Sequence, residues 1–326
     1  MATLTQQPTR LINIRSEAAH RGLRSEDLAI LKGFALSCAA EVNGGEIGEN
    51  SISFFPTRSP RGLNEHLDVP DDEDGPGHAN ALVVANALTP ILARTGVFST
   101  LNCRGETYGA NVLTHDYFAN VTLSAFKRMG LYAYASMAAA GYGIGSRGEV
   151  GVEIEPSHVD GLQWSDRGKL VAVRAIVATS ELPDLVGQRG VAHLARLGYY
   201  ANLGVDAETI KVKSRSPGAF VTVWAEFERG FGGATALGAR GVRMESVVQG
   251  AFQTFLDWYQ TDATVDPFLA DQLLLPAVLA EGETTFKVSK LTQRFLTIVW
   301  VIKQFLPIHI TIKGQEGGPG LVTVRR

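Results

Sequence analysis

The sequence is poor in cysteine: it holds only Cys38 and Cys103, and their spacing matches no structural zinc motif. Both lie in stretches that are predicted to be hydrophobic core, so a disulfide framework is not expected and a reducing cytoplasm is the expected location. The seven histidines form no H-x-x-x-H pattern and no cluster with the cysteines. The sequence therefore predicts no metal site of these residue types.

Long apolar runs and an excess of positive charge are also missing. No stretch approaches the roughly 18 to 20 apolar residues of a membrane span, and the N-terminal MATLTQQPTR lacks the apolar core of a signal peptide. A membrane role is therefore not expected. The net charge of −3 argues against duplex DNA as a partner, but it leaves room for a small basic pocket that holds one nucleic-acid end.

What the sequence does contain is a repeated order of elements. The change of hydrophobic period from 2 to 3.6 and back predicts strand, helix, strand, Gly-rich hairpin and strand in three segments. They run from LINIR to SISFFP (11–56), from STLNCR through a helix at 115–130 to EVGVEIEP (99–156) and from TTFKVS to LVTV (284–324). Internal repetition of this kind predicts stacked α/β units in one large domain.

A leading strand and helix precede two of the three repeats. LNEHLDV (63–69) and an apolar helix at 78–95 precede the second, whereas GATALGARG (233–241) and an amphipathic helix at 243–260 precede the third. Only the ten residues MATLTQQPTR stand ahead of the first repeat. We therefore expect its leading half to be missing from this chain.

Between the second and third repeats lies a region of different pattern. It holds GKLVAVRAIVATSELP, a helix at 185–198 and the strand GAFVTVWAEFE, with Gly-containing turns at both connections. We predict a mixed α/β (α+β) fold of repeated βαβαββ-type units, the first truncated, over 1–167 and 242–326. A small inserted α/β domain is predicted at 168–241.

Two motifs suggest a binding function that their context does not support. GYGIGSRG (141–148) has the glycines of a phosphate-binding loop, but a strand follows it where such a loop needs a helix, which favours a hairpin turn. DVPDDEDGPG (68–77) packs five acids into ten residues and is interpreted as a solvated loop rather than a cation site. A Ser–His–Asp signature and a nucleophile elbow are both missing, so hydrolase chemistry has no support.

The stretch FLADQLLLPAVLAEG (268–282) combines polar and apolar residues in an unusual way. Asp271 and Gln272 stand side by side in an otherwise apolar run, which predicts a buried helix. A buried carboxylate is costly unless it is paired or hydrogen-bonded. Asp271 therefore either caps a neighbouring backbone turn or belongs to a polar site.

Several stretches together resemble the RNA 3′-terminal phosphate cyclase family. They are FLADQLLLPAVLAEG, FKVSKLTQRFLTIVWVIKQFLP, EGGPGLVTV, ATALGARG, GGEIGENSISFFP and the spaced IR, GL and DL of 14–28. The resemblance runs through nearly the whole chain. It implies three repeated α/β units with a smaller inserted domain, which agrees with the architecture predicted from the repeats.

The resemblance also implies an activity and a set of site residues. In this family ATP adenylates an active-site histidine, AMP passes to an RNA 3′-phosphate, and the neighbouring 2′-hydroxyl closes a 2′,3′-cyclic phosphate. ATP, Mg²⁺ and an RNA 3′ end are therefore the implied cofactors and partner. Phe268, Asp271 and Gln272 match the family's nucleotide pocket, and Arg15 matches an arginine expected near the triphosphate.

The chain also departs from the family at positions that matter for catalysis. Arg294 stands where the nucleophilic histidine is expected, and a guanidinium that stays protonated cannot form a phosphoramidate. Ala18 replaces a second expected arginine, and Glu26 replaces an expected glutamine. The leading half that we expect to be missing would have carried the family's Gly-rich turn and a glutamate associated with the metal.

Three hypotheses follow. The first is a catalytically impaired cyclase-like protein that binds RNA ends or phosphate, using Arg294 and Arg15, in RNA processing. The second is an active ATP-dependent cyclase with an altered active site, whose start lies further upstream. The third is a module that binds a protein or a ligand other than RNA. We favour the first, because an upstream segment would not restore the histidine.

Overall fold

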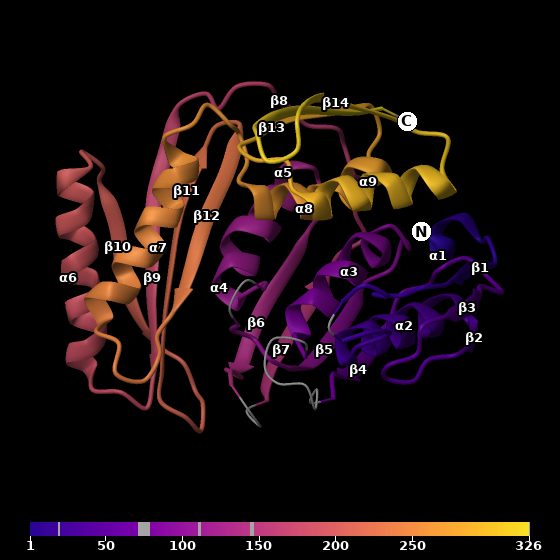
Figure 1. The fold of residues 1–326 in the computed structure, drawn as a ribbon, viewed down its shortest axis with the longest axis horizontal. Coiled ribbons are helices and arrows are strands. Elements are labelled where there is room, and N and C mark those ends of the chain that lie inside the picture. The colour runs from indigo at the N-terminus through magenta and orange to yellow at the C-terminus, as the bar shows by residue number, and fades with distance from the viewer. Residues whose placement is uncertain (19, 71–78, 110–111, 144–146, 326) are drawn as a thin grey trace. The chain divides into compact units, whose positions relative to one another are not determined.

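The structure is a computed structural model that describes residues 1–18, 20–70, 79–109, 112–143 and 147–325 (Figure 1). The chain divides into two compact units. Unit 1 comprises Met1–His115 and Leu131–His158, and unit 2 comprises Asp116–Gly130 and Val159–Arg326. Most of the acidic loop predicted at 68–77 and part of GYGIGSRG lie outside the described residues.

Unit 1 begins with the first repeat, a three-stranded antiparallel sheet in the order β1-β3-β2. Its elements are α1 (Ala2–Thr5), β1 (Thr9–Leu11), α2 (Ser25–Cys38), β2 (Glu41–Asn43) and β3 (Ile52–Phe55). The strand predicted from residue 11 onward was wrong in position, since β1 ends at Leu11. The chain turns there because Asn13 and Arg15 adopt the left-handed conformation, with φ of 58° and 48°.

The second repeat supplies the other sheet of unit 1. Its elements there are β4 (Asn64–Asp68), α3 (Ala81–Ala93), β5 (Ser99–Gly105), β6 (Ala133–Ala139) and β7 (Gly148–Ile154). The order is β4-β5-β7-β6, with β4 and β5 parallel and the other neighbours antiparallel. The helix α3 begins at Ala81 because the Asn80 side chain accepts hydrogen bonds from the amides of Leu82 and Val83, at 2.9 and 3.0 Å.

The two cysteines are buried, unpaired thiols of unit 1. Burial raises the pKa of the Cys103 thiol to about 12, so this group stays protonated and packs as a small apolar side chain. Their prediction as core residues is confirmed.

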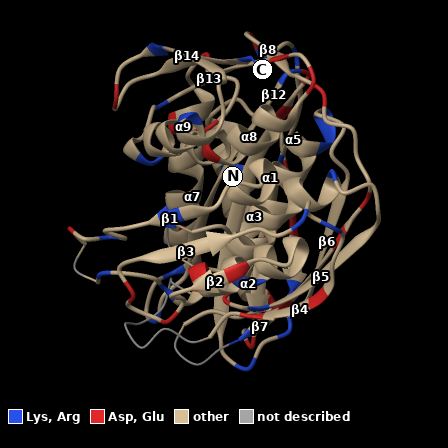
Figure 2. Ribbon diagram, turned by 90° about the vertical axis from the view of Figure 1, so that its right-hand side faces the viewer, with Lys and Arg blue, Asp and Glu red and all other residues tan. Residues whose placement is uncertain are grey.

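Acidic and basic residues are interspersed along the strands and turns of unit 1 (Figure 2). In the part of the chain that the structure describes, no helix combines the length and the apolar character that crossing a membrane requires.

The helix predicted at 115–130 is present, with one irregular turn. α4 (His115–Tyr117), the π-helical turn η1 (Phe118–Thr122) and α5 (Leu123–Arg128) follow one another without a break. Single π-helical turns inside a helix are frequent at functional sites because they re-aim the side chains beside them. Tyr117 and Thr122, at either end of this turn, both contact the candidate site described below.

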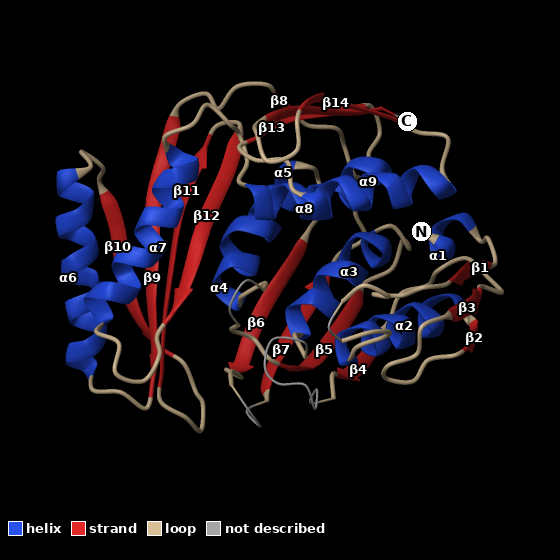
Figure 3. Cartoon of the chain, in the orientation of Figure 1, coloured by secondary structure: helices blue, strands red, loops and turns tan. Residues whose placement is uncertain are grey.

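The third repeat lies in unit 2 and has the same strand order as the second. Its sheet has the strand order β14-β15-β13-β8 (Figure 3). Its elements after β8 are, in chain order, α8 (Pro267–Leu279), β13 (Glu283–Val288), α9 (Gln293–Phe305), β14 (His309–Gly314) and β15 (Gly320–Arg325). β8 (Gln163–Trp164) is parallel to β13, as β4 is to β5. The repeated βαβαββ architecture is therefore confirmed.

The leading strand of the third repeat is β8, and its prediction as GATALGARG was wrong. That stretch forms β12 (Gly230–Leu237), which pairs antiparallel with β11 (Gly218–Phe227) over its whole length. The leading helix is likewise α8. This arrangement could not be predicted from the sequence, because residues 165–266 separate β8 from α8 and because a strand of two residues has no hydrophobic periodicity.

Residues between β8 and α8 form a second four-stranded sheet in unit 2. The strand order is β10-β9-β11-β12, where β9 spans Leu170–Ser180 and β10 spans Val205–Lys211. Two helices, α6 (Asp184–Tyr200) and α7 (Met244–Tyr259), pack on this sheet and on each other. Only β9 and β10 are parallel neighbours. An inserted domain with boundaries at 168 and 241 stays a prediction.

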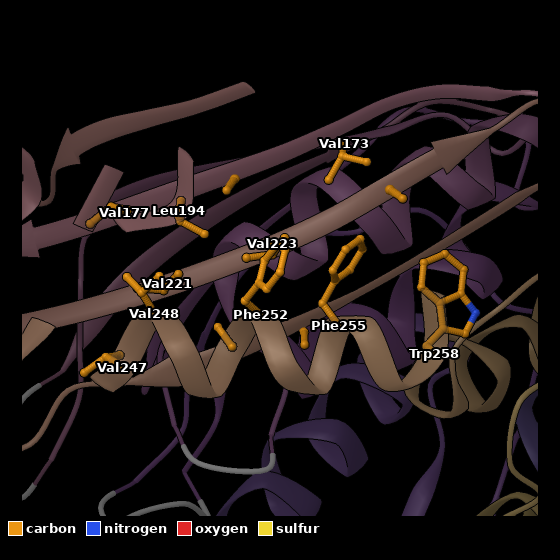
Figure 4. Packing of buried hydrophobic residues seen from close by; sticks show 14 of the residues in the cluster. Val173, Val177, Leu194, Val221, Val223, Val247, Val248, Phe252, Phe255 and Trp258 are labelled. Carbon is orange, nitrogen blue, oxygen red and sulfur yellow. The ribbon is translucent and has the colours of Figure 1, made fainter. Parts of the chain in front are cut away.

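The core of this second sheet is built largely by α7. Its buried residues recur at three- and four-residue intervals, as the predicted amphipathic helix requires, and Figure 4 shows Val248, Phe252 and Phe255 pointing from α7 toward the strands. Opposite them lie Val221 and Val223 of β11. Trp258 closes the end of the cluster and is 3% exposed.

Gly232 provides a test of this packing. A Cβ added at Gly232 of β12 would lie 2.5 to 2.6 Å from ring atoms of Trp258. We expect Gly232→Ala to lower the free energy of unfolding by about 1 to 3 kcal/mol, because the ring or the strand must shift. Urea unfolding followed by tryptophan fluorescence measures this change.

Gly250, on the exposed side of α7, is the matched control. A Cβ there meets no atom within 4 Å. Gly250→Ala should leave stability unchanged or raise it by up to about 1 kcal/mol, since alanine favours the helix. Equal losses from the two substitutions would contradict the close contact between Gly232 and Trp258.

Candidate functional site

Asp266 fixes the start of α8. Its Oδ1 accepts hydrogen bonds from the amides of Phe268 and Leu269, at 2.7 and 2.9 Å. Its Oδ2 accepts the hydroxyl of Tyr117 at 2.6 Å and the amide of Gly233 at 3.0 Å. The residue is 3% exposed, so one buried carboxylate ties α8 to the helical segment before η1 and to β12.

Burial raises the pKa of both Asp266 and Tyr117. Desolvation raises the pKa of Asp266, while the hydrogen bonds from Tyr117 and the three amides work in the opposite direction. Burial, followed by the charge of Asp266, raises the pKa of Tyr117 well above its usual range. The phenol therefore remains a hydrogen-bond donor to Asp266, and the pair positions α8.

Three of the predicted site residues share one face of α8. Phe268, Asp271 and Gln272 stand at i, i+3 and i+4, which places them side by side along the helix. The Phe268 ring meets Tyr117 edge to face, with centroids 5.3 Å apart. The side-chain Oε1 of Gln272 accepts a hydrogen bond from the Thr122 hydroxyl, and its Nε2 donates to the backbone carbonyl of Phe268 at 3.3 Å. The α8 face thus lies against the η1 turn.

Arg294, at the start of α9, completes the group. α8 and α9 are neighbours (Figure 1), and Nε of Arg294 donates to Oδ2 of Asp271. The guanidinium carbon is 5.2 Å from the centroid of the Phe268 ring, which is a cation–π contact. The Asp271 side chain is 8% exposed and that of Arg294 is 55% exposed. A buried carboxylate is therefore paired with an arginine whose outer part reaches solvent.

Asp271 and Arg294 each have hydrogen-bonding atoms that no described residue engages. Burial raises the pKa of Asp271, while Arg294 acts to lower it. Within the described residues, Oδ1 of Asp271 is buried and has no hydrogen-bond partner. Such an atom can accept a hydroxyl or amino group of a ligand. The two terminal nitrogens of Arg294 also have no partner among the described residues, and they can donate to phosphate oxygens.

Arg15 lies in unit 1, on the turn between β1 and α2. Its guanidinium pairs with both carboxylate oxygens of Asp27, with Nη2 3.1 Å from Oδ1, and donates to the Gly22 carbonyl at 3.0 Å. Asp27 also accepts the amide of Arg24 at 2.8 Å, which begins α2. Of the predicted residues, the structure thus brings together Phe268, Asp271, Gln272 and Arg294 in unit 2, and it places Arg15 in a salt bridge of unit 1.

Glu26, the residue that replaces an expected glutamine, is a second perturbed carboxyl of unit 1. Burial, followed by the adjacent charge of Asp27, raises its pKa to about 7. Its Oε2 is buried without a partner among the described residues. Glu26 therefore keeps its proton to a higher pH than an ordinary glutamate does.

The sequence interpretation missed the residues that hold α8 in place: Asp266, Tyr117 and Thr122. Asp-Pro at 266–267 is a local signal for a helix start, because an aspartate before a first-turn proline caps well. No such signal exists for Tyr117, which lies 149 residues from Asp266 along the chain. Among the residues that the structure describes, no group of three or more His, Cys, Asp or Glu could hold a metal ion.

Comparison with known proteins adds a family. The family model described as RNA 3′-terminal phosphate cyclase matches residues 1–312. A protein of that name from Gloeothece citriformis is 32% identical over 308 residues, which cover 94% of this chain and 87% of the relative. The proteins of that name from Methylococcus capsulatus and Thermococcus onnurineus are each 30% identical to this chain, and each alignment covers 99% of it. The alignments cover 90% of the Methylococcus protein and 93% of the Thermococcus protein. The resemblance drawn from the motifs is confirmed.

Arg294→Gln tests the buried pair. Burial already holds the folded pKa of Asp271 above its unfolded value, and loss of the cation raises it further. A carboxyl with a raised folded pKa lowers stability as pH rises from its unfolded pKa through its folded pKa. We expect the variant to be about 1 to 2 kcal/mol less stable than the parent near pH 7, with the difference shrinking toward pH 4. Urea unfolding at both pH values measures it.

Asp271→Asn in the Arg294→Gln background is the control, since asparagine needs no cation. The difference between the double variant and Asp271→Asn should not depend on pH. A loss in Arg294→Gln that is equal at both pH values would contradict charge pairing as its cause.

Glu26→Gln tests the second carboxyl. The raised pKa of Glu26 makes the folded protein lose stability as pH rises from about 4.5 to about 7, because the unfolded chain ionises first. Glutamine removes this dependence. We expect the variant to gain about 2 kcal/mol over the parent above pH 7 and nothing below pH 4. Glu65→Gln, on strand β4, is the control; a pH-dependent gain there would count against burial of Glu26 as the cause.

Proposed function

The chain belongs to the RNA 3′-terminal phosphate cyclase family, and we propose that it binds phosphorylated RNA 3′ ends without forming a covalent nucleotide adduct at residue 294. The observation that carries this proposal is the pairing of Arg294 with Asp271, at the position where the nucleophilic histidine is expected. A guanidinium keeps its proton at neutral pH. Arg294 therefore offers positive charge and no lone pair for attack on phosphorus.

The exposed part of Arg294 is suited to a terminal phosphate. Its Nε is engaged by Asp271 and its plane by the Phe268 ring, so the guanidinium is held in one orientation before a ligand arrives. Arginine binds phosphate through two parallel N–H donors, and a preorganised side chain loses less entropy on binding. We propose that this group holds the 3′-phosphate. A phosphate-binding role of Arg15, in unit 1, is a separate prediction of the family resemblance, and its guanidinium is engaged by Asp27 and the Gly22 carbonyl.

ATP is the nucleotide that family membership implies, and Phe268, Asp271 and Gln272 would hold it. The unpartnered Oδ1 of Asp271 fits a hydroxyl or amino donor of a nucleotide. Mg²⁺ would accompany the triphosphate, since this ion is held mainly through phosphates and one or two carboxylates. When bound, ATP supplies an activated phosphoanhydride; the side chains of α8 and α9 contribute binding and orientation.

Labelling decides between binding and catalysis. The protein is incubated with ATP labelled at the α-phosphate and a divalent cation, with and without 3′-phosphorylated RNA, and resolved by denaturing electrophoresis. We expect no labelled protein band and no 2′,3′-cyclic product. A labelled band or cyclised RNA would overturn the non-catalytic proposal and favour an active cyclase with a substitute nucleophile. The cyclase from Gloeothece citriformis serves as positive control.

End binding is measured separately by fluorescence anisotropy, with one single-stranded RNA prepared as its 3′-phosphate and as its 3′-hydroxyl. The parent should prefer the phosphate, and Arg294→Ala should reduce that preference by about tenfold, the effect of one charged hydrogen-bonded contact. Arg196→Ala, an exposed arginine of α6, is the matched control and should retain the preference. A parent protein indifferent to the phosphate would favour a ligand other than an RNA end.

A further inference from the structure

A cavity of about 680 Å³ opens at one end of the β9–β12 sheet, within unit 2. Its walls come from the start of α6, the start of β11 and the connection from β12 to α7. Apolar side chains such as Val186, Met244 and Val247 line part of it, and Arg189, Arg240 and Arg243 supply positive charge. This volume is that of a typical small-ligand pocket, about 300 to 1,000 Å³.

The topology of the sheet brings these arginines together. β10 is parallel to β9, and β12 has the same direction because both β9 and β12 are antiparallel to β11. The carboxyl ends of β9, β10 and β12 therefore meet at one edge, and the helices that follow β9 and β12 start there. In open α/β sheets, ligands bind outside the carboxyl ends of strands.

Two of the three arginines are available to an anion. Arg189 donates to Glu245 at 2.7 and 2.9 Å, so its charge is balanced. Arg240 and Arg243 are exposed, and no carboxylate of the described residues lies within 4.0 Å of either. Gly241 between them has a φ of 82°, and a Cβ there would meet nothing within 4 Å, so backbone and ligand can approach closely.

The neighbouring connection adds to the positive charge. Lys213 and Arg215 lie between β10 and β11 and are exposed, and this connection leads into Pro217, which lines the cavity. Lys211, at the end of β10, is already balanced by Asp184 at 2.8 Å. Among the described residues at this edge of the sheet, four exposed cations (Lys213, Arg215, Arg240 and Arg243) face one exposed acid, Glu181, that has no salt bridge, so positive charge is in local excess.

We propose that this cavity binds the phosphate backbone of single-stranded RNA, at nucleotides other than the one that carries the terminal phosphate. The inference rests on the proposed function, which makes RNA the ligand of this chain. Arginines without acidic partners fit phosphates, and the apolar wall can cover a ribose. Among the described residues that line the cavity none is aromatic, so bases are not held by stacking and binding is independent of base sequence.

The test combines Arg240→Ala with Arg243→Ala and measures affinity for a fluorescein-labelled single-stranded RNA across a series of KCl concentrations. We expect the double variant to bind about tenfold more weakly at low salt. The slope of log affinity against log salt should fall by about 0.7 for each lost phosphate contact. Because both side chains are exposed, urea unfolding should be unchanged. Arg240→Lys with Arg243→Lys should restore the slope, and Arg196→Ala should not alter it.

The outcomes separate this inference from the function on which it rests. The double variant should keep its preference for a 3′-phosphate over a 3′-hydroxyl. Arg294→Ala should reduce that preference by about tenfold and, measured with the 3′-hydroxyl RNA that lacks the terminal phosphate, should keep the salt slope of the parent. RNA binding with an unchanged slope in the double variant would overturn the cavity and leave the proposed function standing. A parent protein that binds no RNA at any salt concentration would overturn both. A base preference in the parent that the double variant loses would also contradict backbone binding.

Discussion

One buried carboxylate sets the geometry on which the candidate site of unit 2 depends. Asp266 accepts bonds from two amides of α8, from the Gly233 amide and from the Tyr117 hydroxyl. Since a buried carboxylate is strongly destabilising unless its oxygens are fully bonded, the fold must keep α8, β12 and the segment before η1 in register with one another. The direction and rotation of α8 follow, and with them the positions of Phe268, Asp271 and Gln272.

The second carboxylate of the same helix is satisfied in a different way, and the difference separates a structural acid from one that can meet a ligand. Both oxygens of Asp266 are saturated by protein donors, so this residue has nothing left to offer. Asp271 has one oxygen on Arg294 and one without a partner among the described residues. Its cation is half exposed, so solvent or a ligand can enter on that side. Among the described residues, the unused hydrogen-bonding groups are therefore at Asp271 and Arg294, whereas Asp266 fixes the position of α8.

Local sequence patterns predicted the positions of several helices, because short-range interactions determine where a helix begins and ends. The hydrophobic period located α3, α6 and α7 within a few residues, and the polar pair at 271 and 272 marked the helix that carries the candidate site. Long-range pairing was not predictable in this way. The Tyr117–Asp266 bond and the β8–β13 pairing each join segments more than a hundred residues apart, and only the folded chain brings them together. The strand β10 was missed because its residues are largely exposed and so carry a weak apolar signal.

A histidine and an arginine give different chemistry to a site that already holds a buried carboxylate. A histidine can lose its proton and carry a transferred group, and an adjacent carboxylate orients its ring. The same carboxylate beside an arginine fixes a permanent charge and a planar fork of donors, which recognises phosphate but cannot bond covalently to it. The buried position of Asp271 gives this charge a structural role as well, because Arg294 offsets part of the cost of burying the carboxylate. Under the proposed function, phosphate binding and the stability of the α8–α9 pair depend on the same side chain, Arg294.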